Sequence, residues 1–151
     1  MAAEKRALTV RWKGGHGFEA ANPEGATVRF GSAHEEAALS PVELLLASLA
    51  GCSGTDVVDI LAKKRQAVSG LEIRVEGMRA ANPPRVYTSI HLEYVVRGTG
   101  LTQHGVAQAI SLSRNKYCSV AQMLDKTAEI QTSFRIETEP GEESRPQPPS
   151  K

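Results

Sequence analysis

The sequence predicts an α+β fold, in which short strands precede and separate two long helical segments. Three observations carry this prediction. Apolar and polar residues alternate with a period of two in several segments, a capping box opens one long apolar run, and a second segment has apolar residues at helical spacing. The predicted order of elements is β-β-β-α-β-β-α-β, with both helices buried at the centre.

The first third of the chain predicts a meander of three strands. In the first strand, Leu8, Val10 and Trp12 alternate with polar residues, so this face should lie inside. Two turns rich in glycine and asparagine separate it from a short second strand and from a third. The third strand and the loop after it span residues 26–31 and 32–39.

A long helix is predicted to begin after Ser40. This serine is a good N-cap, Pro41 suits the first helical position, and Glu43 completes a Ser-x-x-Glu capping box. The helix should end near Arg65, where basic residues complement the negative end of the helix dipole. Its first three turns are apolar on almost every side, which indicates a fully buried helix.

The length of the chain bears on how this helix is covered. A domain of 151 residues buries a real core, but it has difficulty surrounding a helix that is apolar all round. Ala47, Ser48, Ala50 and Gly51 are small, so another helix can approach closely. Burial against a second copy of the chain meets both conditions, and we therefore expect an intimate homodimer.

The second half predicts two strands, a helix and a last strand. Residues 71–76 and 86–97 alternate between apolar and polar side chains. The helix should begin near Thr102, and the polar stretch Ser111–Lys116 allows a kink or a break within it. Its apolar stripe is Val106, Ile110, Tyr117, Val120 and Leu124, and the last strand uses Ile130, Thr132, Phe134 and Ile136.

Charge and hydropathy weigh against several kinds of partner. Lys and Arg total 18 and Asp and Glu total 17, so the net charge is +1. The basic residues form no stripe that could follow a phosphate backbone, which argues against nucleic-acid binding. No stretch approaches the roughly 20 apolar residues of a membrane span, and the start has no signal-peptide core. We expect a cytoplasmic protein, with no membrane partner and with thiols at rest in the reduced state.

The C-terminal segment differs from the rest in composition. Residues 139–151 are polar and rich in proline. Because such a segment cannot bury enough apolar surface to fold, we expect a disordered tail after a single domain of residues 1–138.

The two cysteines bear most directly on function. Cys52 and Cys118 each lie inside a helix-forming segment, and the second follows 66 residues after the first. A disulfide scaffold needs more cysteines, and neither cysteine has a partner at zinc-ligand spacing. The four histidines are dispersed, so we expect neither a metal nor a cofactor. Either the cysteines are small buried hydrophobes, or one is a reactive thiol with a distant resolving partner.

The neighbours of Cys52 give mixed signals about its reactivity. Gly51 and Gly54 each lower helix propensity by roughly 1 kcal/mol, so small residues serve a purpose there. That purpose is either tight packing or access for a substrate. Asp56 and Asp59 lie on the helix face of Cys52, where carboxylates oppose thiolate formation.

Cations near a thiol would favour its thiolate form. Arg29 is the cation that we place nearest a thiol, and the alternative is an ordinary arginine on the solvent face of a strand. Arg114 and Lys116 could act in the same way on Cys118, or could simply be solvated. Glu43 has its capping role as the alternative to a place in a reactive site.

Two segments carry a resemblance to a known family. Residues 40–56, Ser-Pro-Val-Glu-Leu-Leu-Leu-Ala-Ser-Leu-Ala-Gly-Cys-Ser-Gly-Thr-Asp, resemble the first-cysteine helix of the OsmC/Ohr family. The segment Tyr117-Cys118-Ser119-Val120 resembles its second-cysteine helix. The element order matches over roughly residues 7–138, and the resemblance is nearest to the YhfA-like branch.

The resemblance implies an intertwined homodimer with active sites at the subunit interface. The peroxidases of the family reduce organic hydroperoxides with a cysteine pair, and an external dithiol resets them. By that pattern Cys52 is the peroxidatic thiol and Cys118 the resolving one. Arg29 and a glutamate, for which Glu43 is the candidate, would orient the thiolate, and the role would be in oxidative stress defence.

The chain departs from the peroxidase pattern at two positions. It has Val42 where the peroxidases carry a glutamate, and the nearest carboxylate, Glu43, is rotated by about 100° on the helix. It also has Ser119 where the peroxidases typically have proline. Two other functions therefore stay open: a redox-sensing or small-molecule-binding dimer that is not a peroxidase, and a structural dimer with two packing cysteines.

Overall fold

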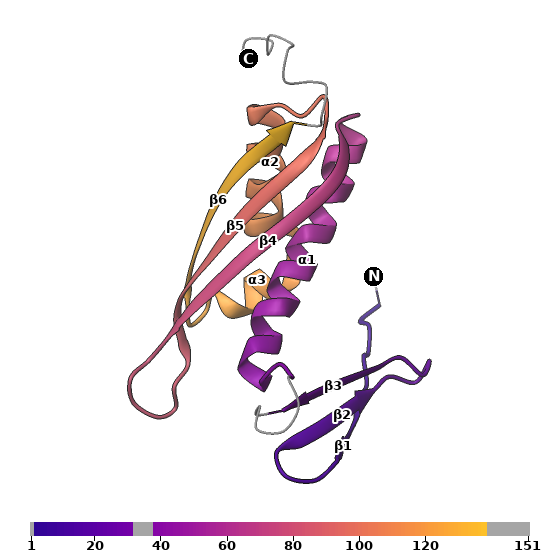
Figure 1. The fold of residues 1–151 in the computed structure, drawn as a ribbon, viewed down its shortest axis with the longest axis vertical. Coiled ribbons are helices and arrows are strands. Elements are labelled where there is room, and N and C mark those ends of the chain that lie inside the picture. The colour runs from indigo at the N-terminus through magenta and orange to yellow at the C-terminus, as the bar shows by residue number, and fades with distance from the viewer. Residues whose placement is uncertain (1, 32–37, 139–151) are drawn as a thin grey trace. The chain divides into compact units, whose positions relative to one another are not determined.

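The computed structural model describes residues 2–31 and 38–138. The predicted tail and most of the loop predicted at 32–39 lie outside these residues. The chain forms two compact units, Met1–Leu45 and Leu46–Lys151. The predicted α+β order is confirmed, with the second helix divided into three parts. The elements are β1 (Thr9–Trp12), β2 (Gly17–Ala21), β3 (Thr27–Gly31), α1 (Pro41–Lys63), β4 (Ala67–Arg79), β5 (Tyr87–Thr99), α2 (Gln103–Leu112), η1 (Ser113–Tyr117), α3 (Ser119–Leu124) and β6 (Glu129–Thr138) (Figure 1).

The N-terminal unit holds the predicted meander, with β2 between β1 and β3 and all pairs antiparallel. Trp12 lies opposite Phe18, and Phe18 lies opposite Phe30, so one face of this sheet is apolar. In the single chain the side chains that β1 contributes to that face are exposed, with Trp12 at 68% of its full accessibility. The expectation that it lies inside was therefore wrong for the single chain, because alternation reports an amphipathic strand and not what covers it.

The capping box at the start of α1 is confirmed in detail. The backbone N–H of Ser40 donates to the Glu43 carboxylate at 2.9 Å, and the N–H of Glu43 donates to the Ser40 hydroxyl at 3.2 Å. The helix ends at Lys63, two residues before the predicted Arg65. It ends there because Arg65 takes a left-handed conformation, with φ at 61°, that a helix cannot continue.

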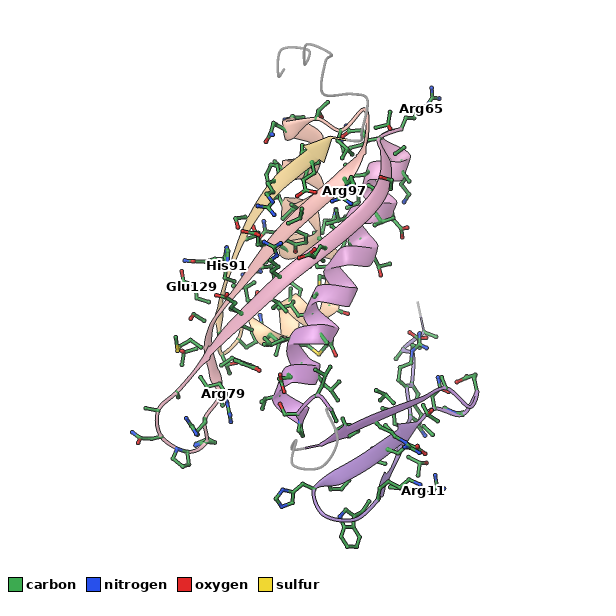
Figure 2. The ribbon with its side chains drawn as sticks, viewed as in Figure 1. Arg11, Arg65, Arg79, His91, Arg97 and Glu129 are labelled. Carbon is green, nitrogen blue, oxygen red and sulfur yellow. The ribbon has the colours of Figure 1, made fainter. Side chains whose placement is uncertain are left out.

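The C-terminal unit is one three-stranded sheet with the helices on one face (Figure 1). The strands β4 and β5 form a long antiparallel hairpin, and β6 lies parallel to β5. A parallel pair needs a crossover, which α2, η1 and α3 supply. Alternate residues of β5 enter the core beneath α1, and they include the fully buried Tyr94. His91 and Arg97 of β5 lie on the opposite face (Figure 2), where Arg97 pairs with Glu137.

The second helical segment differs most from its prediction. Its start is confirmed, since the Thr102 hydroxyl caps α2 by accepting from the Gly105 N–H at 3.0 Å. The predicted break in the polar stretch is confirmed as the π-helical turn η1. Cys118 itself lies outside any helix, in an extended conformation with φ −74° and ψ 105° between η1 and α3. Because a π-turn adds a residue and rotates those after it, Tyr117 is 53% exposed and does not continue the apolar stripe.

The burial of α1 also corrects two expectations. Leu49, Val57 and Leu61 are fully buried, but Leu45 and Val58 are exposed, so the single chain covers one face of the helix only. By length and composition alone α1 is apolar enough to cross a membrane, and the expectation that no stretch approaches such a span was wrong. Core helices of soluble proteins share this property, and the buried leucines and valine of α1 pack as in such a core.

Candidate active site

Cys52 and Cys118 lie together in the C-terminal unit. The two thiols lie close enough for each to shift the pKa of the other, and the sulfur of Cys52 lies 3.8 Å from the hydroxyl oxygen of Ser119. Both cysteines are free thiols. The crossover between β5 and β6 packs its π-turn against α1, and this packing brings the second cysteine to the first.

The surroundings of Cys52 favour its thiolate. Partial burial raises the pKa of the thiol, as does the charge of Asp56. Hydrogen bonds from the Val120 backbone N–H, the Cys118 thiol and the Ser119 hydroxyl act in the opposite direction. Together they outweigh burial, and the pKa of Cys52 lies below its ordinary value. The prediction that Asp56 opposes the thiolate is confirmed.

Cys118 is held as a protonated thiol. Burial is the main cause that raises its pKa to about 11, and the charges of Cys52 and Asp56 add to it. The backbone N–H of Ala121 donates to the Cys118 sulfur at 3.3 Å, which offsets only part of this rise. At neutral pH the pair therefore consists of a donor thiol, Cys118, beside a more acidic one, Cys52.

The two glycines beside Cys52 have different surroundings. A Cβ at Gly54 would lie 3.1 Å from the Ile73 Cδ1 and 3.6 Å from the Leu71 Cδ2, so Gly54 lets α1 pack closely on β4. A Cβ at Gly51 would meet nothing within 4 Å. Tight packing thus accounts for Gly54, whereas Gly51 leaves open space on the exposed side of the helix.

Arg29 and Glu43 belong to the N-terminal unit and have other partners there. Arg29 is on the polar face of β3, its side chain is 75% exposed, and its Nε lies 3.2 Å from the Glu19 carboxylate. The Glu43 carboxylate is the acceptor of the α1 cap. Hydrogen bonds from the Ser40 backbone and side chain hold the pKa of Glu43 below its ordinary value. A role for either residue at the thiols stays a prediction.

The cations next to Cys118 in sequence have partners of their own. The Arg114 guanidinium donates to the Ile130 carbonyl oxygen and lies 3.3 Å from the Asp125 carboxylate. The Lys116 ammonium lies over the ring of Tyr117, 5.2 Å from its centre. Within residues 2–31 and 38–138, no three His, Cys, Asp or Glu side chains gather as a metal site.

Sequence reasoning missed three polar residues beside the pair. Ser53, Ser113 and Tyr94 are buried and hydrogen-bonded to one another beneath the cysteines. Tyr94 was expected only as an apolar residue of its strand. The one signal in the sequence was a serine directly after Cys52, inside an apolar helix.

Comparison with known proteins places the chain in a family. A family model described as OsmC-like protein matches residues 33–133. The protein YhfA of Escherichia coli K12 is 38% identical over 127 residues, which cover 84% of this chain and 95% of YhfA. The chain belongs to the OsmC-like family, and the predicted resemblance is confirmed.

Solved structures share the fold. A hypothetical protein from Aquifex aeolicus VF5 is 33% identical, with a TM-score of 0.82 over 91% of this chain and 99% of that one. The organic hydroperoxide resistance protein OhrB of Bacillus subtilis is 15% identical, with a TM-score of 0.61 over 89% of this chain and 100% of that one. At that identity the likeness to OhrB shows the fold alone.

Proposed function

We propose that the protein is a thiol-dependent peroxidase that reduces organic hydroperoxides through Cys52 and Cys118, in defence against oxidative stress. One observation carries the proposal: two free thiols lie close enough to shift each other's pKa, and the pKa of one is lowered while that of the other is raised. A peroxidase with a resolving cysteine needs this asymmetry, because one thiol must attack as a thiolate and the other must wait protonated.

The first step uses the Cys52 thiolate. Its sulfur attacks one oxygen of the hydroperoxide, the O–O bond breaks, and the alkoxide that leaves takes up a proton to become an alcohol. Cys52 is then a sulfenic acid. The thiol of Cys52 is only partly buried, which leaves it accessible to an alkyl hydroperoxide.

The second step uses the Cys118 thiol. Its sulfur bonds to the sulfur of Cys52, its proton leaves with the hydroxyl group as water, and a disulfide results. An external dithiol then reduces this disulfide and is itself oxidised to a disulfide. The cytoplasm, where such dithiols are kept reduced, is the compartment that we propose.

Arg29 and Glu43 are the residues that we propose to orient the Cys52 thiolate. To do so, Arg29 must break its ion pair with Glu19, and Glu43 must break its hydrogen bond with Ser40. An exposed ion pair such as Arg29–Glu19 stabilises a protein by only about 0–1 kcal/mol. A thiolate could therefore compete for Arg29 at little cost. Glu43 is held more firmly, because its carboxylate closes the cap of α1.

The assembly that we propose is a homodimer with its active sites at the subunit interface. Two apolar surfaces of the single chain support it: the exposed side of α1 with Leu45 and Val58, and the sheet face with Trp12. A second copy of the chain could cover them, in keeping with the small residues of α1.

A second candidate is a redox-sensing or small-molecule-binding dimer of the same fold. The observation that favours it is the engagement of Glu43 in the helix cap and of Arg29 with Glu19. In such a protein the cysteines would oxidise slowly, without turnover. We place the peroxidase first because the opposite pKa shifts of Cys52 and Cys118 suit an attacking and a resolving thiol.

The test is the loss of protein thiols after addition of cumene hydroperoxide or hydrogen peroxide, followed by intact mass under denaturing conditions. The wild type should consume cumene hydroperoxide faster than hydrogen peroxide. Its mass should fall by two hydrogens per chain, with no added oxygen. Cys52→Ser should abolish turnover. In Cys118→Ser, Cys52 should persist as sulfenic acid and over-oxidise in excess peroxide. Full turnover in Cys52→Ser, or two separately oxidised thiols without a bridge, would remove the proposal.

A further inference from the structure

A buried network of hydroxyl groups lies beside the cysteine pair, and the proposed chemistry does not use it. The Ser53 hydroxyl oxygen lies 2.5 Å from the Tyr94 phenol oxygen and 2.9 Å from the Ser113 hydroxyl oxygen. The Ser113 hydroxyl in turn lies 2.9 Å from the Asp56 carboxylate. These four residues, which we call the hydroxyl network, join α1 to β5 and to the start of η1.

The network lies in the core. Tyr94 and Ser113 are 0% exposed and Ser53 is 2% exposed. A buried hydroxyl group costs free energy unless it is hydrogen-bonded, whereas Ala and Phe of nearly the same shape cost nothing of this kind. A purely packing role would thus be met by apolar residues. Three hydroxyl groups that satisfy one another are suited to fixing two elements in one relative position.

The network is tied to both thiols through the backbone. Ser53 directly follows Cys52 in α1. Ser113 accepts, through its carbonyl oxygen, the backbone N–H of Cys118 at 2.8 Å, and this bond closes the π-turn that ends at the cysteine. The hydrogen bond between Ser53 and Ser113 therefore connects the residue after one cysteine to the residue that anchors the other.

We propose that Ser53 and Ser113, supported by Tyr94 and Asp56, are positioning residues that hold Cys118 within bonding reach of Cys52. The proposal rests on the cysteine pair of the proposed function, but it concerns how the thiols are placed and not which oxidant they meet. Without the Ser53–Ser113 bond the π-turn can move away from α1, and the two sulfurs meet less often.

The experiment measures disulfide formation without peroxide. The full chain is equilibrated with mixtures of oxidised and reduced dithiothreitol, and the fraction bridged is read by intact mass. Ser113→Ala and Ser53→Ala should each shift the equilibrium about two- to tenfold toward the thiols, the fold-change that the loss of one hydrogen bond produces. The double variant should lose less than the product of the two single effects, because both residues make the same bond.

Ser111→Ala is the matched control. It also removes a serine hydroxyl group, from the helical turn before Ser113, and within the described residues this hydroxyl accepts a hydrogen bond from Asn115 and takes no part in the hydroxyl network. It should bridge like the wild type. Tyr94→Phe keeps the aromatic ring and removes only the hydrogen bond to Ser53. It therefore tests the network if a serine variant fails to fold. With cumene hydroperoxide, Ser113→Ala should give a larger share of sulfinic acid for each Cys52 thiol lost than the wild type does, because Cys118 reaches the sulfenic acid less often; a merely structural role would not change this share.

Two results would overturn the proposal: a wild type that forms no disulfide in the dithiothreitol mixtures, or network variants that bridge like Ser111→Ala. The peroxidase proposal fails separately, if the disulfide forms in dithiothreitol but cumene hydroperoxide oxidises neither thiol.

Discussion

The hydroxyl oxygen of Ser119 lies 3.8 Å from the sulfur of Cys52, at the position where peroxidases of this family typically have proline. Partial burial raises the pKa of Cys52, and the hydrogen bonds from Val120, Cys118 and Ser119 together outweigh it. Proline has no hydroxyl group, so this chain has a donor to the thiolate that the peroxidase pattern lacks. This chain also lacks the glutamate of the peroxidase pattern and has Val42 in its place.

Replacing Ser119 should therefore change the acidity of Cys52. Ser119→Ala removes one of the donors to the thiolate, so the pKa of Cys52 should rise. Only the thiolate is alkylated, and the rate of reaction with iodoacetamide should climb at higher pH than in the wild type. The measurement is made on the Cys118→Ser protein, in which Cys52 is the only thiol. In that background Ser119→Ala is compared with Ser119→Thr. The threonine variant keeps the hydroxyl and should keep the profile; an unshifted profile for the alanine variant would contradict the prediction.

The cap of α1 should contribute measurably to stability. Ser40→Ala removes the acceptor of the Glu43 N–H, and we expect it to lower the free energy of unfolding by about 1 kcal/mol. Ser40→Gly should lose only a few tenths, because glycine is itself tolerated at this position. Urea denaturation of the three proteins measures the difference, and a Ser40→Ala variant as stable as the wild type would contradict the capping role of the serine hydroxyl.

The Glu43 charge should stabilise the fold in a pH-dependent way. Its folded pKa is lowered by the backbone and side-chain hydrogen bonds from Ser40, from an ordinary value of 4.5. A lowered folded pKa means that the contribution is fully present above pH 4.5 and is lost as the pH falls through the folded pKa. Glu43→Gln should thus be less stable than the wild type at pH 6 and should converge with it in acid. A stability difference that does not change with pH would contradict this.

Local signals predicted the fold well, and contacts between distant residues were hidden from them. The capping box of Ser40 and Glu43 was readable because its partners are three residues apart. That Cys52 and Cys118 belong to one site was implied by the family resemblance, not by their spacing. The bond between Ser53 and Ser113 joins residues 60 positions apart, and only the packing of the π-turn on α1 creates it.

The two glycines of α1 should respond differently to alanine. At Gly54 a Cβ would lie 3.1 Å from Ile73, so Gly54→Ala should overpack the contact with β4 and cost about 1–3 kcal/mol. At Gly51 the space is open, and alanine favours the helix, so Gly51→Ala should keep or raise the free energy of unfolding. Urea denaturation of the two variants gives the comparison, since both replace a glycine by alanine in the same helix, three residues apart. Equal destabilisation of both would mean that the space at Gly51 is filled in the folded protein.

The exposed side of α1 should be the centre of the proposed dimer. Val58 is 39% exposed in the single chain, in a stretch of α1 that also holds the apolar residues Val57, Ile60 and Leu61. The wild type should sediment as a dimer at low micromolar concentration, with no folded monomer. Val58→Glu places a carboxylate where the partner is expected, and burying it unpaired is costly, so this variant should sediment as smaller or unfolded chains. Lys126→Glu changes charge at a side chain that is 77% exposed and should leave the dimer intact. A folded wild-type monomer, or a Val58→Glu dimer as tight as the Lys126→Glu control, would place the partner's surface elsewhere or remove the dimer altogether.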